Sequence, residues 1–356
     1  MPQRSDPLHN VPENIRPVVE ALLDQIGCHD PYSITILKET LELISGNHAT
    51  ADLKIMARVI NEVSTGLEVF RPYQACRKVS MFGSARTSSD HPHYVQTKQC
   101  ARALRDEGFM IITGAGGGIM QAANEGAGFE HSFGININLP LEQGSNPVLA
   151  GSPRHFECRY FFTRKLFFLK ESDAIVLSPG GFGTLDEAFE TITLLQTGRN
   201  PPIPVVLLES PGDDYWGPFV GSWMRRLIHD GFISPEDTHL MFHTDSVEAA
   251  TKHITSFYSN YHSFRYAGKW VVLRILSPLS DAALARLNAE FSDVLEGGVI
   301  EQVTNWPHND DPEFDHLPRL RMHLNRSRVN VLPQIIRRMN GLADKGNGKA
   351  ANRERA

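Results

Sequence analysis

The segment Ser178–Glu190, SPGGFGTLDEAFE, combines residues that could hold a phosphate with carboxylates that could act beside it. Gly180, Gly181 and Gly183 follow the apolar run Ala174–Leu177, which predicts a buried strand. Glycine leaves backbone N–H groups uncovered, so an anion can approach the turn and the start of the next helix. A helix start needs one special residue and not three, so the glycines favour a phosphate-binding loop.

Glu187 has two interpretations. With Thr184 as N-cap, T-x-x-E is a capping box in which Glu187 only satisfies a backbone N–H. Alternatively, the carboxylate meets a ligand that carries hydroxyl groups or develops positive charge. On a helix Glu190 shares a face with Glu187, whereas Asp186 is turned away. Glu190 is expected to support the site from behind or to lie on the solvated surface.

A second glycine loop, Gly114–Met120, follows the apolar run Phe109–Thr113 and precedes a helix rich in small residues. The dinucleotide fingerprint G-x-G-x-x-G fits poorly, because Ile119 occupies its sixth position and the next strand, Gly134–Asn138, ends without an acidic residue. NAD is therefore disfavoured. A tight turn without a ligand remains an alternative for this loop alone, but two such loops at one sheet edge suggest two walls of one anion site.

The histidine, acidic and cysteine residues that could bind a metal do not have the spacing of a metal site. His91-Pro-His93 lacks an evident third ligand and is expected to be a surface loop. The acidic run Asp310–Asp315 lacks EF-hand spacing and is expected to be solvated. The cysteines form no CxxC pair, which argues against a zinc ribbon and a disulfide framework; they are Cys28, Cys76, Cys100 and Cys158.

Short apolar runs alternate with amphipathic segments in the middle of the chain, which predicts βαβ units. The expected fold is α/β, a Rossmann-like parallel sheet with helices on both faces, and such sheets bind ligands beyond the carboxyl ends of their strands. The expected strands are 79–82, 109–113, 133–138, 174–177 and 204–208, and the expected helices are 94–107, 118–128, 158–171 and 184–197.

The regions before and after this part of the chain do not show the same alternation of strands and helices. Residues 1–70 are expected to form an N-terminal helical segment, 71–262 the Rossmann-like domain with both glycine loops, 263–341 a small α+β domain and 342–356 a disordered tail. In the small domain we expect strands at 269–276, 298–304 and 318–324 and helices at 280–295 and 330–341.

Composition excludes some functional classes. The chain has 356 residues with 41% hydrophobic and 21% charged residues, and its net charge of −6 disfavours nucleic acid and anionic membranes as partners. The N-terminus has no apolar signal core, and no stretch reaches transmembrane length, so a cytoplasmic location is expected.

Four stretches, in order, resemble the LOG (Lonely Guy) family of nucleoside 5′-monophosphate phosphoribohydrolases, long mislabelled as lysine decarboxylases. Pro179–Glu187, PGGFGTLDE, matches the family motif PGGxGTxxE, and the others are Phe82–Arg86, Gly116–Asn124 and the pair Arg164-Lys165. The resemblance covers roughly 77–260, with Ala115 where many members have glycine. Because the flanking regions make this a longer chain than the plant-type enzymes, cytokinin specificity does not follow.

The resemblance implies hydrolysis of the N-glycosidic bond of a nucleoside 5′-monophosphate, an AMP-like purine nucleotide above all, without a metal or other cofactor. It also implies a homodimer or higher homo-oligomer. Arg164, which could otherwise be a basic residue snorkelling to solvent, becomes catalytic with Glu187. The residues expected to bind substrate are Gly83, Ser84, Gly116, Gly117, Gly118, Met120, Lys165, Gly180, Gly181, Gly183 and Thr184.

Three other functions use the same loops. A regulatory protein could bind a nucleotide without chemistry, and a carrier could hold a phosphorylated cofactor such as molybdopterin. Lysine decarboxylation would need a lysine that forms a Schiff base with pyridoxal phosphate. Lys165 is the only candidate near the glycine loops, and the arginine beside it suits phosphate better.

Overall fold

The computed structural model describes residues 11–13, 15–27, 30–138, 144–303 and 314–343. The chain divides into two units, Met1–Asn61 and Glu62–Ala356. The first unit contains α1 (Arg16–Ile26), α2 (Pro31–Ser45) and the beginning of α3 (Thr50–Phe70), so the helices expected before residue 70 are confirmed. The division at residue 61 separates two compact units of the chain and does not test the domain boundaries that the sequence predicts. Those boundaries stay predictions.

The second unit is built on a seven-stranded sheet with the order β4-β3-β2-β1-β5-β6-β7, in which every pair is parallel. The predicted α/β fold is confirmed. The strands are β1 (Lys78–Phe82), β2 (Met110–Thr113), β3 (Ser132–Ile137), β4 (His155–Cys158), β5 (Ala174–Leu177), β6 (Val205–Leu208) and β7 (Phe242–Thr244).

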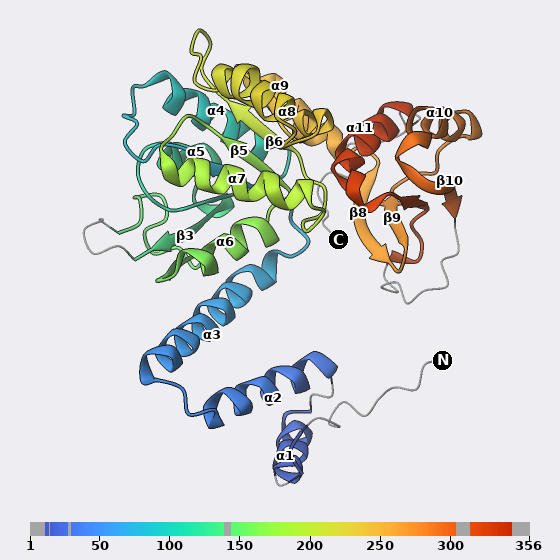
Figure 1. Cartoon of the computed structure of the whole chain (residues 1–356). Coiled ribbons are helices and arrows are strands. Elements are labelled where there is room, and N and C mark those ends of the chain that lie inside the picture. Colours follow the sequence, from blue (N-terminus) through green and yellow to red (C-terminus); the bar gives the residue numbers. More distant parts are fainter. Residues whose placement is uncertain (1–10, 14, 28–29, 139–143, 304–313, 344–356) are drawn as a thin grey trace. The chain divides into compact units, whose positions relative to one another are not determined.

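Alternation along the strands produces a hydrophobic core on each face of this sheet. Ile111 and Val176 pack with one set of helices, α4 (Pro92–Asp106), α5 (Ile119–Ala127) and α9 (Val247–Phe257). Ile112 and Leu177 pack with another set, α6 (Phe161–Lys170), α7 (Phe182–Gln196) and the end of α3. The two sets of helices cover opposite faces of the sheet (Figure 1).

A four-stranded antiparallel sheet follows, with the order β10-β11-β9-β8, and confirms the predicted α+β region. Its buried side chains join the core around α9. Its strands and helices are β8 (Tyr261–Ala267), β9 (Trp270–Ile275), α10 (Asp281–Phe291), β10 (Leu295–Val303), β11 (Arg319–Leu324) and α11 (Leu332–Leu342).

Several boundaries differ from the sequence-based expectation. The helix expected at 158–171 begins only at Phe161, because His155–Cys158 forms the edge strand β4, whose alternating exposure hides it from a search for apolar runs. The expected surface loop at His91 is wrong, since His91 is the N-cap of α4 and accepts a hydrogen bond from the backbone N–H of His93. Further elements escaped prediction, among them β7, β8, α8 (Met224–His229) and α9.

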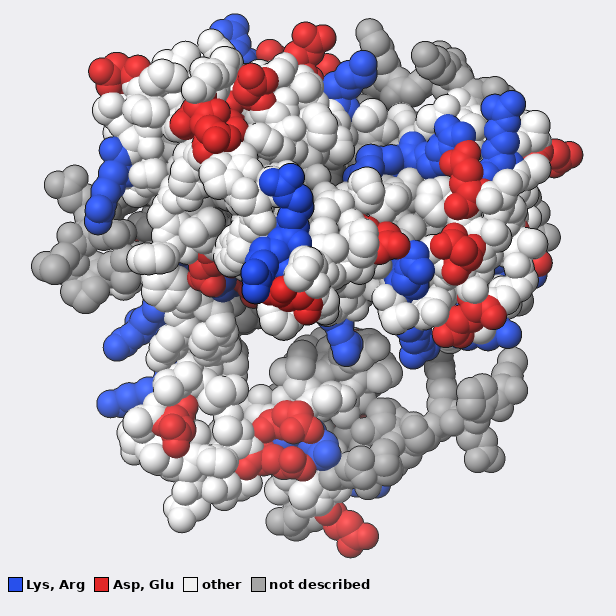
Figure 2. All heavy atoms as spheres, turned by 45° about the horizontal axis from the view of Figure 1, so that its top comes forward, with Lys and Arg blue, Asp and Glu red and all other residues white. Residues whose placement is uncertain are grey.

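The expectations for residues 310–313 of the acidic run and for the tail beyond 343 lie outside the described residues. Among the residues with described positions, no helix is both long and apolar enough to cross a membrane. Basic and acidic side chains are interspersed on the face of the molecule shown in Figure 2.

Candidate functional site

The order of the strands places a crevice beside β1. From β1 the chain moves outward through β2, β3 and β4 on one side, then returns to place β5, β6 and β7 on the other. Loops that leave β1 and β5 at their carboxyl ends therefore diverge, and such a switch point is where doubly wound sheets bind ligands.

Three loops meet at this crevice and are hydrogen bonded to one another. The N–H of Ser84, after β1, donates to the carbonyl oxygen of Pro179, after β5, at 3.0 Å. The carbonyl oxygen of Ser84 accepts from the N–H of Ile119, at the start of α5, also at 3.0 Å. The loop after β1 thus holds the two glycine loops together.

The loops surround a cavity of about 690 Å³, a size typical of small-molecule sites. Most of the predicted site residues line this one cavity, so the two glycine loops form walls of the same hollow. Those lining it are Gly83, Ser84, Gly116, Met120, Arg164, Gly181, Gly183, Thr184 and Glu187.

The other predicted residues, Gly117, Gly118, Gly180 and Lys165, do not line this cavity. Gly118 has φ of +60°, and a Cβ there would lie 2.3 Å from the carbonyl oxygen of Ser84. A Cβ on Gly180 would lie 2.2 Å from Oγ1 of Thr184. Gly118 and Gly180 therefore allow the loops to pack closely rather than expose backbone to a ligand.

Of the two interpretations of Glu187, the capping box is wrong. Helix α7 begins at Phe182, its N-cap is Gly181, and no side chain accepts a hydrogen bond at this cap. Thr184 lies inside the first turn, and its N–H donates to the carbonyl oxygen of Gly181 at 3.0 Å. Because the helix starts earlier than the sequence suggests, Glu187 is not positioned to cap it.

Glu187 is instead a buried carboxylate on the cavity wall, 5% exposed. Burial raises the pKa of Glu187 from its ordinary value of 4.5 to about 7, although the positive charges of Lys165 and Arg164 oppose this change. An acid with such a pKa changes charge near neutral pH, which is a property of groups that take part in acid–base or electrostatic catalysis.

Lys165 lies behind Glu187 among three carboxylates. Its Nζ is 2.7 Å from Oε2 of Glu190, 3.0 Å from Oδ2 of Asp186 and 3.7 Å from Oε2 of Glu187. Burial would lower the pKa of Lys165, but the hydrogen bonds to Glu190 and Asp186 outweigh it and the pKa rises. Lys165 thus stays charged and neutralises the carboxylates, whereas a Schiff-base lysine needs a depressed pKa.

Helix α6 holds Arg164 against two aromatic rings. Its guanidinium carbon lies 4.8 Å from the ring centre of Phe161 and 5.7 Å from that of Phe168. These contacts orient the planar group by cation–π attraction. At the start of α6, the buried Glu62 accepts hydrogen bonds from the backbone N–H of Arg159 at 2.8 Å and Oγ1 of Thr163 at 2.5 Å.

Sequence reasoning did not assign other residues that line the cavity. Asn136 lies at the carboxyl end of β3 and is 9% exposed, and Arg86 follows Ser84. Arg86 belongs to a stretch that carried the family resemblance, and Asn136 lies near the end of a predicted strand at the same sheet edge. Position at the end of a parallel strand is the signal that could have found both. Phe182, on the rim, is 92% exposed.

Backbone strain marks the second glycine loop. Ala115 has φ of +61°, a left-handed conformation that favours glycine, and its N–H donates to Oγ1 of Thr113 at 3.0 Å. A glycine, which many LOG proteins have here, would adopt this backbone conformation without strain.

A doubly wound sheet with a glycine-lined cavity at its switch point is an arrangement in which proteins of this fold class bind nucleotides. Comparison with known proteins agrees: residues 117–254 match the family model described as "Possible lysine decarboxylase". The resemblance to the LOG family inferred from the motifs is confirmed over this part of the chain.

Curated relatives are named as phosphoribohydrolases. The cytokinin riboside 5′-monophosphate phosphoribohydrolase LOG1 of Arabidopsis thaliana is 33% identical over 116 residues, 32% of this chain and 53% of the relative. A cytokinin riboside 5′-monophosphate phosphoribohydrolase of Mycobacterium tuberculosis is 34% identical over 91 residues, 25% of this chain and 46% of the relative. The chain thus spans about half the length of these relatives.

Solved structures are similar at a lower level. The molybdenum cofactor binding protein of Rippkaea orientalis aligns with a TM-score of 0.35 and 18% identity, over 51% of this chain and 96% of that one.

Proposed function

We propose that the protein hydrolyses the N-glycosidic bond of a nucleoside 5′-monophosphate, with an AMP-like purine nucleotide as the preferred substrate. The observation that carries this proposal is a buried carboxylate, Glu187, on the wall of the same cavity as Arg164 and the exposed backbone of two glycine loops. The names of the curated relatives agree with this chemistry.

The glycine loops and the N-termini of α5 and α7 would bind the 5′-phosphate. Backbone N–H groups at helix starts provide donors, and the helix dipole favours negative charge. A Cβ on Gly181 or Gly183 would have no atom within 4 Å, so the backbone there is open to a ligand.

Hydrolysis breaks the bond between the ribose C1′ and the base nitrogen and forms a bond from C1′ to a water oxygen. The ribose becomes positively charged in the transition state, as in glycoside hydrolysis. Ionised Glu187 would stabilise this charge and bind ribose hydroxyls, and it could accept the proton of the attacking water. Arg164 would orient the ribose phosphate through its planar fork. The departing base receives a proton, and the products are free base and ribose 5-phosphate.

The direct test is to incubate the full chain with AMP, GMP, CMP and IMP and to measure free base by chromatography. Release of base, greatest for a purine nucleotide, supports the proposal. Saturable binding of these nucleotides without release of base would contradict it and would favour a regulatory nucleotide-binding protein.

Gly183 provides a test of contact between backbone and phosphate. We expect Gly183→Ala to fold normally, because its Cβ enters open space, but to raise KM for AMP about tenfold or more, since a methyl group there blocks the approach of an anion. Steady-state kinetics measures the effect. Gly341→Ala, in α11, is the matched control, because Gly341 also has no atom near its Cβ. Equal KM values for both variants would contradict phosphate binding at this turn.

The pKa of Glu187 predicts how the rate depends on pH. If ionised Glu187 is the active form, kcat/KM for AMP rises with pH and levels off above about 7, because the pKa of Glu187 is about 7. The phosphate of AMP titrates at about pH 6, and this titration also affects kcat/KM. The pH dependence of kcat at saturating AMP is therefore measured as well. A rate that falls through pH 7 would instead indicate that Glu187 acts as a general acid.

We also propose a cytoplasmic homodimer or larger homo-oligomer. The exposed ring of Phe182 beside the cavity supports a subunit contact there, and light scattering of the purified chain measures its mass in solution.

A further inference from the structure

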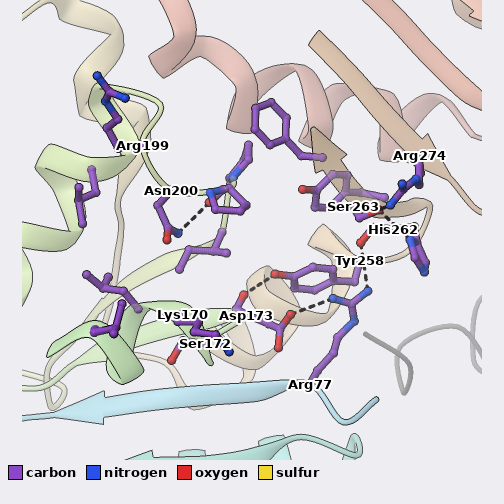
Figure 3. A pocket seen from close by; sticks show the side chains of 18 of the residues that line it. Arg77, Lys170, Ser172, Asp173, Arg199, Asn200, Tyr258, His262, Ser263 and Arg274 are labelled. Carbon is purple, nitrogen blue, oxygen red and sulfur yellow. Dashed lines mark hydrogen bonds and ion pairs between the residues drawn. The ribbon is translucent and has the colours of Figure 1, made fainter. Parts of the chain in front are cut away.

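A second cavity, of about 750 Å³, lies at the opposite edge of the parallel sheet. Arg77 immediately precedes β1, Asp173 precedes β5 and Ile203 precedes β6, and all three line it. The other wall comes from the antiparallel sheet, including Ser263 and Arg274 (Figure 3). The cavity therefore lies between the parallel-sheet region and the C-terminal α+β region.

The walls of this cavity combine guanidinium groups with aromatic rings. Arg77 forms an ion pair with Asp173 at 3.1 Å and lies 3.8 Å over the ring of Tyr258. Arg274 lies 4.7 Å over the ring of Phe314. Such walls suit a molecule with a planar ring and a negatively charged group, because rings stack on both aromatic and guanidinium planes.

Arg199 supplies a positive charge that is not already engaged. It lies in the connection from α7 to β6, it is exposed, and its guanidinium has no hydrogen-bond or ion-pair partner among the described residues. A neighbouring cavity of about 290 Å³ shares Arg199 and is also lined by Lys269 and Arg326, with no acidic residue in its lining. The positive field around Arg199 favours phosphate.

The two cavities are connected by the helices that form their walls. Arg164, near the start of α6, faces the first cavity, whereas Lys170, at its end, lines the second. Similarly, Glu187 on α7 lines the first cavity and Leu194, further along the same helix, lines the second. A ligand that shifts the ends of these helices would also shift the residues at their beginnings.

One side chain links the cavities directly. Glu190 lines the second cavity, and its Oε2 lies 2.7 Å from Nζ of Lys165. The same Nζ lies 3.7 Å from Oε2 of Glu187 in the first cavity. A new charge near Glu190 would therefore change the electrostatic environment of Glu187 through one intervening ammonium group.

We infer that the second cavity binds a nucleotide-sized organic phosphate, with its phosphates on Arg199, and that its occupancy changes turnover at the first cavity. The volume and the aromatic lining favour a nucleotide over a small dicarboxylate. The binding part is independent of the proposed hydrolase activity, whereas the effect on turnover rests on it.

Binding is tested by calorimetric titration of the full chain with ATP and GTP, with saturating ribose 5-phosphate to fill the first cavity. We expect one saturable site per chain for at least one of these nucleotides. Tripolyphosphate lacks the planar ring and adenosine lacks the phosphates, so each should bind about tenfold or more weakly than that nucleotide. Arg199→Ala should weaken binding about tenfold or more, while Arg102→Ala, an exposed arginine on α4, should not.

The effect on turnover is tested with AMP as substrate in the presence and absence of the nucleotide that binds. We expect kcat/KM to change about fivefold or more in wild type and not in Arg199→Ala, whose basal rate stays normal. Absence of binding by both nucleotides, or equal binding by Arg199→Ala, would overturn the site. Binding without a change in rate would overturn the regulation. If AMP is not hydrolysed at all, the proposed function fails and the binding result still decides the site.

Discussion

Glu187→Gln should lower kcat for AMP hydrolysis by about a hundredfold or more and at the same time stabilise the fold near pH 8. The loss of activity follows from removing the negative charge that faces the developing positive charge on the ribose. The gain in stability follows from burial, since Glu187 is 5% exposed and an ionised carboxylate is costly there.

The direction of the stability change follows from the two pKa values. In the folded protein the pKa of Glu187 is about 7, above its ordinary value of 4.5. Between these values the folded state binds more protons than the unfolded state, so the free energy of unfolding falls as pH rises through this window. Above pH 7 the full penalty, about 3 kcal/mol, is present in wild type and absent in Glu187→Gln.

Urea denaturation near pH 5 and near pH 8 measures this penalty. The two proteins should differ little at the lower pH, and Glu187→Gln should be the more stable at the higher pH. Removing Glu187 leaves Lys165 with Asp186 and Glu190, so no buried cation loses its partners. Asp186→Asn is the matched control, because Asp186 also contacts Lys165 but is exposed, and it should keep both the rate and the stability. A loss of stability in Glu187→Gln would instead show that Glu187 stabilises the fold.

The sequence predicted the sheet and its carboxyl edge, because these depend on local periodicity and on strand ends. The pair Arg164 and Glu187 was expected only from the resemblance to the LOG family, and both residues line the first cavity. The sequence did not predict where α7 starts. T-x-x-E satisfies the local rule for a capping box, but Gly181 becomes the N-cap because the loops after β1 and β5 are hydrogen bonded to each other. A contact between distant segments overrides the local signal.

The glycines illustrate the same limit. Gly118 and Gly183 look alike in the sequence, yet Gly118 faces the backbone of Ser84, whereas Gly183 faces open space. Only the packing of the loops separates a glycine that permits close approach of protein from one that exposes backbone to a ligand. Strands β4 and β7 escaped prediction because they are short edge strands with partly exposed residues.

Arg164 should prove as important to turnover as Glu187, for a different physical reason. We expect Arg164→Ala to lower kcat/KM for AMP about a hundredfold or more. Arg164→Lys keeps the charge but loses the planar fork and the stacking on Phe161 and Phe168, so it should still lose about tenfold or more. Nearly wild-type activity in Arg164→Lys would show that charge alone suffices.

The pH profile distinguishes an effect of Arg164 on the chemistry from a loss of structure. The positive charge of Arg164 lowers the pKa of Glu187, against the larger effect of burial, which raises it. Removing that charge in Arg164→Ala should move the rise of kcat/KM to a pH above that of wild type, whereas Arg164→Lys should leave its midpoint nearly unchanged. A residue that merely supports helix α6 would lower the rate at every pH without moving the midpoint, so an unmoved midpoint in Arg164→Ala would argue against electrostatic contact between the guanidinium and the carboxylate.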